Sequence, residues 1–163
     1  IYTRVLKGHI AVASFNLKKN TSGSIIDIKA RKYLRQINLD YAHGTGHGVG
    51  YFLNVHEGPH AISKNNAINF QAGMVVSNEP GYYEKDNFGI RIENLIYVKK
   101  DKQKNHFDNL TMVPIDKDLI DLKILNKKER NWLNNYHKKV FNNLKKFMSK
   151  IEVLELKKAC SAI

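Results

Sequence analysis

The chain has 163 residues, of which 42% are hydrophobic, and this is enough for one ordinary domain with a core. Such a composition excludes collagen-like, mucin-like and wholly disordered chains. Lys and Arg total 27 against 15 Asp and Glu, so the net charge is +12 and the composition first suggests an acidic partner. The single cysteine, Cys160, excludes an intramolecular disulfide and favours a reducing, intracellular setting.

Two helices are predicted at the start of the chain. Residues 1–16 carry apolar side chains at helical spacing, namely Val5, Leu6, Ile10 and Ala13. Ser24 is a favourable N-cap, and Asp27 three positions later resembles a capping box, so a second helix is predicted to begin there. The apolar face of this second helix is formed by Ile26, Ala30, Leu34 and Ile37.

Short β-type runs separated by glycine fill residues 41–98 and predict a sheet. The runs are residues 51–55, 74–78 and 89–98. The lysine-rich stretch 99–109 predicts a solvated loop or hairpin tip. Residues 110–115 predict an edge strand, whose pairing Pro114 limits.

A long amphipathic helix is predicted near the C-terminal end. Asn126 is a favourable N-cap with Glu129 at the third position, and a pattern that continues to about Ala159 corresponds to a helix of about 50 Å. Its apolar stripe consists of Trp132, Tyr136, Val140, Leu144, Phe147 and Ile151. Residues 1–98 carry 11 basic and 7 acidic side chains and residues 99–163 carry 16 and 8, so most of the net charge lies beyond the predicted sheet.

The densest chemical signal is a set of histidines and glutamates within the predicted sheet. Its members are His43, His47, His56, His60, Glu79 and Glu93. Imidazole nitrogens and carboxylate oxygens are ligands of Zn, Mn, Fe or Co, and a carboxylate-rich set favours Mn. Glycines at positions 44, 46, 48 and 50 allow close backbone approach, so a histidine among them can be aimed into a cleft.

Two other motifs in this stretch are rejected on physical grounds. The glycines form no complete Gly-x-Gly-x-x-Gly, and no Gly-Lys-Ser/Thr follows them, so a phosphate-binding loop is disfavoured. Residues 56–60 match His-Glu-x-x-His, a zinc motif that requires a continuous helix. Gly58 and Pro59 oppose such a helix, so we interpret this match as a coincidence.

The two glutamates lie near strand ends. Glu79 precedes Pro80-Gly81, which predicts a turn at the end of a strand. Arg91 and Glu93 are two positions apart and therefore face the same side of a strand. Spacing alone favours a solvated ion pair for Arg91 and Glu93 over a metal ligand with a charged neighbour.

Four motifs, taken in order, resemble those of aminopeptidase P. They are His43-Gly-Thr-Gly-His47-Gly-Val-Gly, Asn54-Val-His56-Glu-Gly-Pro59, Asn78-Glu79-Pro-Gly-Tyr-Tyr83 and Gly89-Ile-Arg91-Ile-Glu93-Asn94. The chain is similar to the C-terminal part of the catalytic domain of X-Pro aminopeptidases, of the pita-bread metallopeptidase family. The resemblance implies an α+β fold, with a curved, mostly antiparallel sheet flanked by helices and a long C-terminal helix. Residues 1–98 correspond to the C-terminal portion of the catalytic domain, and residues 99–163 to an edge hairpin or loop and a C-terminal helical extension.

The resemblance implies two divalent metal ions, commonly Mn with Zn or Co as alternatives, bridged by carboxylates and a water or hydroxide that attacks the peptide bond. His47, Glu79 and Glu93 match metal ligands, and Glu93 matches the carboxylate that bridges both ions. Two aspartate ligands of the family are expected upstream of the opening helix. Asp27 and Asp40 do not have that setting, so the chain alone is predicted to be inactive.

Further roles follow from the same resemblance. His43 and His56 match catalytic histidines that line the substrate pocket, and Arg91 and Tyr83 match residues that hold the carboxylates in place. The implied activity releases the N-terminal residue from peptides with proline in second position. The resemblance also supports a homodimer through the C-terminal region. Independently of the resemblance, no apolar run approaches the roughly 18 residues of a membrane span, so no membrane attachment is expected and the cytoplasm is the default setting.

Two alternatives to an X-Pro aminopeptidase remain. Prolidase and other pita-bread hydrolases share the ligand set, although the motifs favour aminopeptidase P. A non-catalytic relative that binds nucleic acid would explain the +12 charge but not the retained histidines and glutamates. Outside the motifs, His9 is interpreted as a packed or capped residue and His60 as a loop residue near the pocket mouth.

Overall fold

The computed structural model describes residues 1–52, 54–101 and 104–163 of the chain. These residues form two compact units, Ile1–Thr111 and Met112–Ile163. None of the helices in the described residues is long and apolar enough to cross a membrane.

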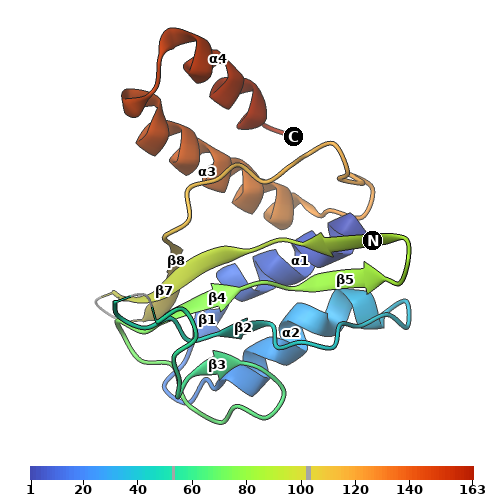
Figure 1. Cartoon of the computed structure of the whole chain (residues 1–163), viewed down its shortest axis with the longest axis vertical. Coiled ribbons are helices and arrows are strands. Elements are labelled where there is room, and N and C mark those ends of the chain that lie inside the picture. The colour runs from blue at the N-terminus through green and yellow to red at the C-terminus, as the bar shows by residue number, and fades with distance from the viewer. Residues whose placement is uncertain (53, 102–103) are drawn as a thin grey trace. The chain divides into compact units, whose positions relative to one another are not determined.

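An antiparallel sheet forms the centre of the first unit (Figure 1). Its strand order is β1 (Asn16–Leu17), β8 (Asn105–Asn109), β7 (Asn94–Lys100) and β4 (Val75–Asn78). Two short antiparallel pairs accompany it, β2 (Gly46–His47) with β3 (Ala61–Ile62) and β5 (Gly81–Glu84) with β6 (Phe88–Arg91). The strands predicted at residues 74–78 and 89–98 are therefore confirmed, the second one as β6 and β7.

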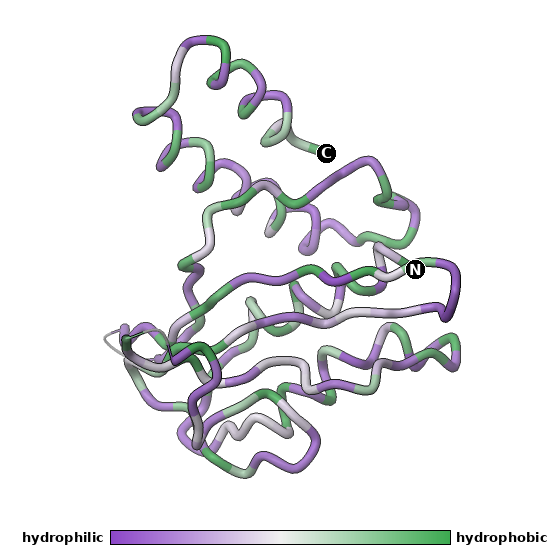
Figure 2. The backbone as a smooth tube through the Cα atoms, in the orientation of Figure 1, coloured by the Kyte–Doolittle hydropathy of each residue, from purple (hydrophilic) through white to green (hydrophobic). Residues whose placement is uncertain are grey.

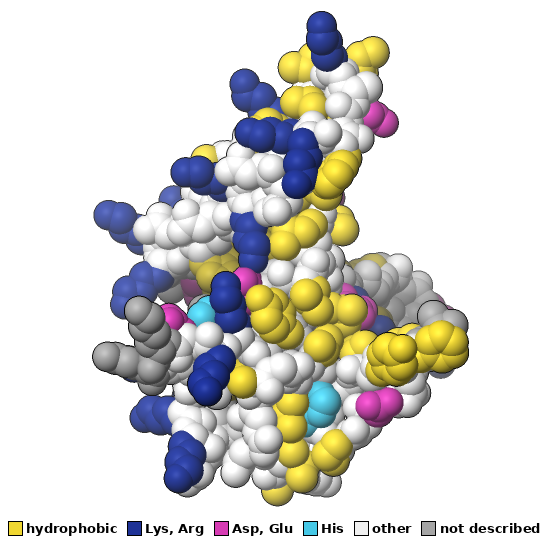
Figure 3. All heavy atoms as spheres, turned by 90° about the vertical axis from the view of Figure 1, so that its left-hand side faces the viewer, with side chains coloured by type: hydrophobic (Ala, Val, Ile, Leu, Met, Phe, Trp, Pro, Cys, Tyr) yellow, Lys and Arg dark blue, Asp and Glu magenta, His cyan; other side chains and the backbone are white. Residues whose placement is uncertain are grey.

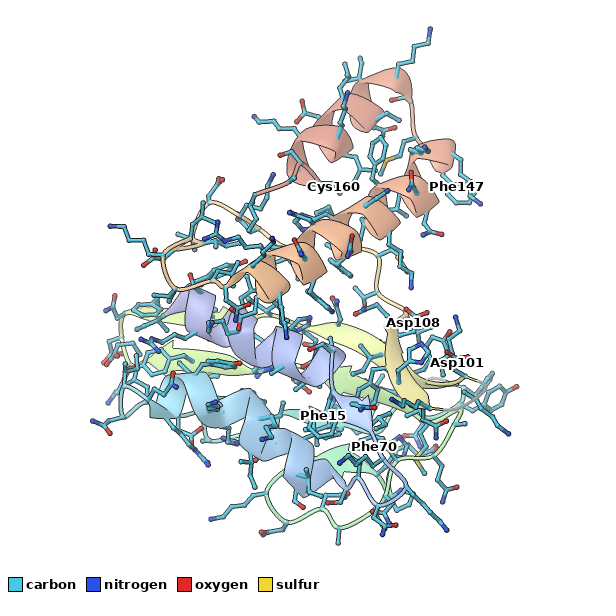
Figure 4. The ribbon with its side chains drawn as sticks, turned by 180° about the vertical axis from the view of Figure 1, so that it is seen from behind. Phe15, Phe70, Asp101, Asp108, Phe147 and Cys160 are labelled. Atoms are coloured by element: carbon cyan, nitrogen blue, oxygen red, sulfur yellow. The ribbon has the colours of Figure 1, made fainter. Side chains whose placement is uncertain are left out.

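Helices α1 (Tyr2–Ala13) and α2 (Gly23–Arg35) cover one face of this sheet, as Figures 1 and 4 show from opposite sides. They pack closely because Gly8 has no side chain: a Cβ there would lie 2.4 Å from the carbonyl oxygen of Ala30. The core between helices and sheet contains Val12, Leu17, Ile26, Ala30, Ile62, Phe70, Val76, Ile96, Val98 and Phe107. Phe15 and Phe70, labelled in Figure 4, belong to this packing.

Both helix boundaries predicted in this unit are shifted. The first helix ends at Ala13 rather than residue 16, because the Ser14 hydroxyl donates to the Ile10 carbonyl and Leu17 joins the sheet as a buried residue. The second helix begins at Gly23 with Ser22 at the N-cap, so the predicted cap at Ser24 is wrong. The Asp27 side chain, expected to help cap this helix, instead accepts hydrogen bonds from two residues of the buried interior.

Three predictions about strands and loops are also corrected. Residues 51–55 do not form a strand: Phe52 has a φ of 53° in a turn closed by the Gly50 amide and the Asn54 carbonyl, and Leu53 lies outside the described residues. Of the two alternatives predicted for residues 99–109, the hairpin is confirmed and the loop is wrong, because Lys99 and Lys100 at the end of β7 pair antiparallel with His106 and Asn105 of β8. Lys102 and Gln103 lie outside the described residues. Residues 110–115, all described, form no strand, because the amides of Leu110 and Thr111 both turn back to the Leu95 carbonyl.

The second unit contains helices α3 (Lys127–Leu144) and α4 (Lys150–Ala159), joined by a 3-10 turn, η1 (Lys145–Phe147). Asn126 and Glu129 form the predicted capping box at the start of α3. The predicted helix does not continue to Ala159, because Met148 is extended and Ser149 begins a new capping box with Glu152. Figure 2 shows hydrophobic and hydrophilic residues alternating along both helices, as amphipathic helices require.

Candidate functional site

Strands β2 and β4 bring His47 and Glu79 together. Their backbones approach so closely that a Cβ at Gly46 would lie 1.8 Å from the Ser77 carbonyl oxygen, so only glycine fits there. The His47 amide donates to the Ser77 hydroxyl (2.9 Å), which itself donates to Glu79 Oε1 (2.8 Å). Local chain geometry therefore fixes both the histidine backbone and the glutamate carboxylate.

A neutral His47 ring would present the lone pair of Nε2 to this carboxylate. Its Nδ1 lies 3.0 Å from the Gly48 carbonyl oxygen, and since a carbonyl only accepts, Nδ1 carries the proton of the neutral ring. Nε2 lies 3.4 Å from Glu79 Oε1. Two ligand atoms each about 2.1 Å from one tetrahedral metal ion lie roughly 3.4 Å apart, so the pair fits a shared metal ion in donor type and spacing.

Glu93 does not join this pair. It is exposed between β6, which ends at Arg91, and β7, which begins at Asn94. The prediction that Arg91 and Glu93 share one face of a strand is therefore wrong for Glu93. Within residues 1–52, 54–101 and 104–163, no group of three or more His, Cys, Asp or Glu side chains is placed to hold a metal ion. The described residues thus supply two converging donor atoms where one metal ion takes four or more.

Arg91 links the Glu79 carboxylate to Tyr83. Arg91 Nη1 lies 3.3 Å from Glu79 Oε2, and Arg91 Nε donates to the Tyr83 hydroxyl at 2.7 Å. This hydrogen bond to Tyr83 raises the pKa of Arg91, and the carboxylates of Glu79 and Glu93 raise it further. Arg91 therefore remains a cation beside both glutamates.

The same tyrosine orients His43. His43 Nδ1 donates to the Gly44 carbonyl (2.7 Å), which leaves Nε2 of the neutral ring to accept from the Tyr83 hydroxyl (3.0 Å). The His43 ring also lies beside Tyr41, with ring centroids 4.9 Å apart. A hollow of about 370 Å³ opens next to it, lined by Arg31, Arg35, Asp40, Tyr41, Ala42, His43, Gly44, Ser63, Lys64 and Asn65.

His56 completes a continuous chain of contacts. Its ring packs against that of His47, with centroids 4.0 Å apart and planes at 33°. The chain runs through His56, His47, Glu79, Arg91, Tyr83 and His43. Six of the seven residues predicted for the site therefore meet, and the seventh, Glu93, interacts electrostatically with Arg91.

Two other histidines have structural roles. His60 lies outside helices and strands, as predicted for a loop residue, and is buried with Nε2 2.7 Å from the Val75 carbonyl oxygen and its ring against Phe70. His9 is fully buried with Nδ1 3.1 Å from the Ile92 carbonyl oxygen, as predicted for a packed histidine. The segment 54–60, which the structure describes in full, contains no helical turn, so the zinc-motif match is a coincidence.

Sequence reasoning missed four residues that support the site: Asp27 as an interior hydrogen-bond acceptor, Arg31, Thr45 and Ser77. Asp27 and Arg31 are spaced i, i+4 in α2, which is a signal for an ion pair. They directly follow Ile26 and Ala30, which belong to the apolar face of the helix, and this position could have suggested that the pair is buried. Thr45 and Ser77 carry no comparable signal, since their roles depend on tertiary contacts.

Comparison with family models identifies the protein family of this chain. Residues 1–100 match the model of metallopeptidase family M24, and residues 104–163 match the model of the C-terminal region of peptidase M24. The chain therefore belongs to metallopeptidase family M24.

Within this family the chain is similar to Xaa-Pro aminopeptidases. It is 49% identical over 154 residues to the probable Xaa-Pro aminopeptidase P of Laccaria bicolor, covering 88% of this chain and 24% of that protein. It is 51% identical over 148 residues to Xaa-Pro aminopeptidase 1 of Dictyostelium discoideum, covering 85% and 24%. The chain thus spans about a quarter of the length of the curated relatives it matches.

Solved structures agree with the predicted fold. The X-prolyl aminopeptidase of Caenorhabditis elegans, described as a cytosolic enzyme with a di-nuclear active site, matches with a TM-score of 0.92 and 40% identity over 99% of this chain and 28% of its own. Prolidase from Pyrococcus furiosus matches with a TM-score of 0.60 and 30% identity over 68% and 31%. The predicted α+β pita-bread fold is confirmed.

Proposed function

We propose that this chain contributes part of the active site of an X-Pro metalloaminopeptidase, a hydrolase that releases the N-terminal residue from peptides with proline in second position. The observation that carries the proposal is the His47 Nε2 to Glu79 Oε1 separation of 3.4 Å, with both groups fixed by local hydrogen bonds. The similarity to Xaa-Pro aminopeptidases supports the substrate class.

The cofactor we propose is a pair of divalent metal ions, most simply Mn, with Zn or Co as alternatives. His47, Glu79 and Glu93 would hold them together with carboxylates from outside the described donor set. When bound, such ions supply a water nucleophile at neutral pH and stabilise negative charge on the scissile carbonyl oxygen. The di-nuclear active site of the Caenorhabditis elegans relative supports a pair of ions.

The chain's own residues orient the site and handle protons. Arg91 holds the Glu79 carboxylate from one side, while Ser77 holds it from the other. His43 can exchange a proton with Tyr83 while it lines the substrate pocket. His56, packed on the His47 ring, lies where it can contact a bound peptide.

Residues 1–163 alone should not catalyse the reaction, because two converging donors do not hold two metal ions. The decisive assay uses the full-length protein with Mn, Zn or Co and compares an X-Pro-Y tripeptide with an X-Pro dipeptide. Preference for the tripeptide supports an aminopeptidase, and preference for the dipeptide indicates prolidase. Absence of turnover with every metal would overturn the proposal.

We also propose a cytoplasmic location and a homodimer through the C-terminal region. The single cysteine and the cytosolic relative support the location. The exposed apolar side chains of Phe147, Ile151 and Leu154 support the dimer, and Phe147 is labelled in Figure 4. Figure 3 shows Lys and Arg side chains spread over the surface of the second unit. In the sequence, most of the basic residues follow the segment that carries the His and Glu donors.

A further inference from the structure

Arg31 on α2 is a buried cation outside the chain of site contacts, with 6% of its surface exposed. Its guanidinium donates to Asp27 Oδ2 through Nε (2.8 Å) and to Asp40 Oδ1 through Nη1 (2.8 Å). It also donates to two backbone carbonyls, those of Tyr41 (2.7 Å) and His43 (2.6 Å). One side chain therefore binds the segment that carries His43 at two successive points.

Asp27 holds the same segment at a third point. Its Oδ1 accepts the hydroxyl proton of Thr45 at 2.6 Å, and Thr45 is fully buried. The Tyr41 hydroxyl hydrogen-bonds to the same Thr45 oxygen, and the Arg31 guanidinium stacks over the Tyr41 ring at 4.0 Å. Residues 41–45 are thus tied to α2 through backbone and side chains together.

The segment 41–45 is also connected to the candidate metal ligands His47 and Glu79. The Thr45 carbonyl accepts from the Glu79 amide at 2.8 Å, and the next residue, Gly46, begins strand β2 with His47. A shift of Thr45 would therefore move the backbone on which Glu79 is held. The cluster touches His43 through its carbonyl and Glu79 through its amide.

The chemistry of the cluster requires arginine. The Tyr41 carbonyl is buried and the His43 carbonyl is partly buried, so both need donors, and leaving them without partners would be costly. A guanidinium presents several N–H groups in a fixed planar fork, whereas a lysine has one compact head group that cannot reach both carbonyls and both carboxylates.

We propose that Arg31, supported by Asp27, is a positioning residue that sets the place of His43 and of the Glu79 backbone. The inference rests on the proposed function only for its catalytic consequence. The placement of the segment 41–45 is a separate property of the fold and can be measured without metal or substrate.

The first experiment is hydrogen exchange on the full-length protein carrying Arg31→Lys, with Arg35→Lys as the matched control. Arg35 lies on the same helix and pairs with Asp40, but is hydrogen-bonded to none of the segment's carbonyls. In R31K we expect exchange at Thr45, Gly46 and Glu79 to rise about 10-fold or more, with exchange in α1 unchanged. In R35K all of these amides should stay within about 2-fold of wild type.

Thr45→Val serves as a second variant if R31K does not fold. It removes the hydroxyl that binds Asp27 and keeps the shape of the side chain, so the same amides should exchange faster by a smaller factor. Unchanged exchange in the segment, or an equal rise in α1, would overturn the positioning role, since the latter indicates general loosening.

The kinetic arm measures X-Pro-Y hydrolysis by the metal-loaded full-length protein. R31K should lower kcat about 10- to 100-fold with KM within about 3-fold, because His43 is misplaced while substrate binding persists. Faster local exchange with an unchanged kcat would overturn the catalytic part of the inference. An inactive wild type would instead refute the proposed function, and the exchange data would still decide whether Arg31 positions the segment.

Discussion

The Ser77 hydroxyl donates to Glu79 Oε1 at 2.8 Å while accepting from the His47 amide at 2.9 Å. One small side chain therefore sets the carboxylate of one candidate ligand relative to the backbone of the other. A carboxylate held in this way needs less reorganisation when it binds a cation, so its supporting hydroxyl contributes to affinity.

Replacing this hydroxyl should weaken metal binding. In full-length protein carrying Ser77→Ala we expect Mn affinity to fall about 10- to 100-fold, the usual cost of losing a partner of a ligand. Isothermal titration with Mn measures this directly. Ser14→Ala, at an exposed helix end, is the control and should bind as wild type. Equal affinities in all three proteins would show that Glu79 needs no support from Ser77.

The Tyr83 hydroxyl should matter for turnover, because it connects Arg91 with His43. We expect Tyr83→Phe to reduce kcat on an X-Pro-Y peptide about 10- to 100-fold with little loss of stability. The neighbouring Tyr82→Phe is a matched control, since Tyr82 hydrogen-bonds to Glu84 instead. A wild-type kcat in Y83F would remove Tyr83 from the mechanism.

Two buried histidines should make stability depend on pH. Burial lowers the pKa of His9 and of His137 from 6.5 to about 4, and the charge of Lys117 adds to the effect at His137. The unfolded chain therefore binds more protons than the folded chain between these values. The free energy of unfolding should therefore have its full value above pH 6.5 and decrease as the pH falls towards 4, by up to about 3 kcal/mol for each histidine.

Urea denaturation of the purified chain at a series of pH values measures this dependence. His9→Gln retains a donor for the Ile92 carbonyl but does not titrate, so its slope against pH should be shallower than that of wild type. Identical slopes would mean that His9 does not contribute to the acid sensitivity.

The exposed apolar surface of the second unit should govern association. Ile151→Asp places a charge among Phe147, Ile151 and Leu154, whose exposed fractions are 78%, 76% and 66%. If this surface forms the dimer contact, the variant of the full-length protein should sediment as a monomer at concentrations where wild type is a dimer. Lys150→Asp, the preceding position, controls for added negative charge. A monomeric wild type would contradict the proposed dimer.

Much of the site could be predicted because its residues lie in short motifs. The spacing of Arg91 and Glu93 predicted two opposite charges close together, and Glu93 does interact electrostatically with Arg91, although it lies beyond the end of β6. The convergence of His47 and Glu79 depends instead on contact between β2 and β4, which only Gly46 permits. No local pattern encodes such a contact.

The wrong predictions about the fold also arise from contacts that the local sequence pattern does not show. Periodicity predicted one helix to Ala159, but the capping box of Ser149 and Glu152 stabilises a new start after the extended Met148. The run 51–55 has strand-like composition, yet its turn is fixed by a hydrogen bond between Gly50 and Asn54. Local capping and tertiary hydrogen bonds override composition in both places.

The two converging donors also bear on how occupancy could be regulated. A histidine nitrogen and a single carboxylate oxygen supply only two of the four or more ligands that a divalent ion takes, so this pair alone should bind the ion weakly. If the remaining ligands come from other segments of the protein, the metal will be retained only in molecules in which those segments are folded against β2 and β4. Metal content would then measure the fraction of molecules with a complete catalytic unit.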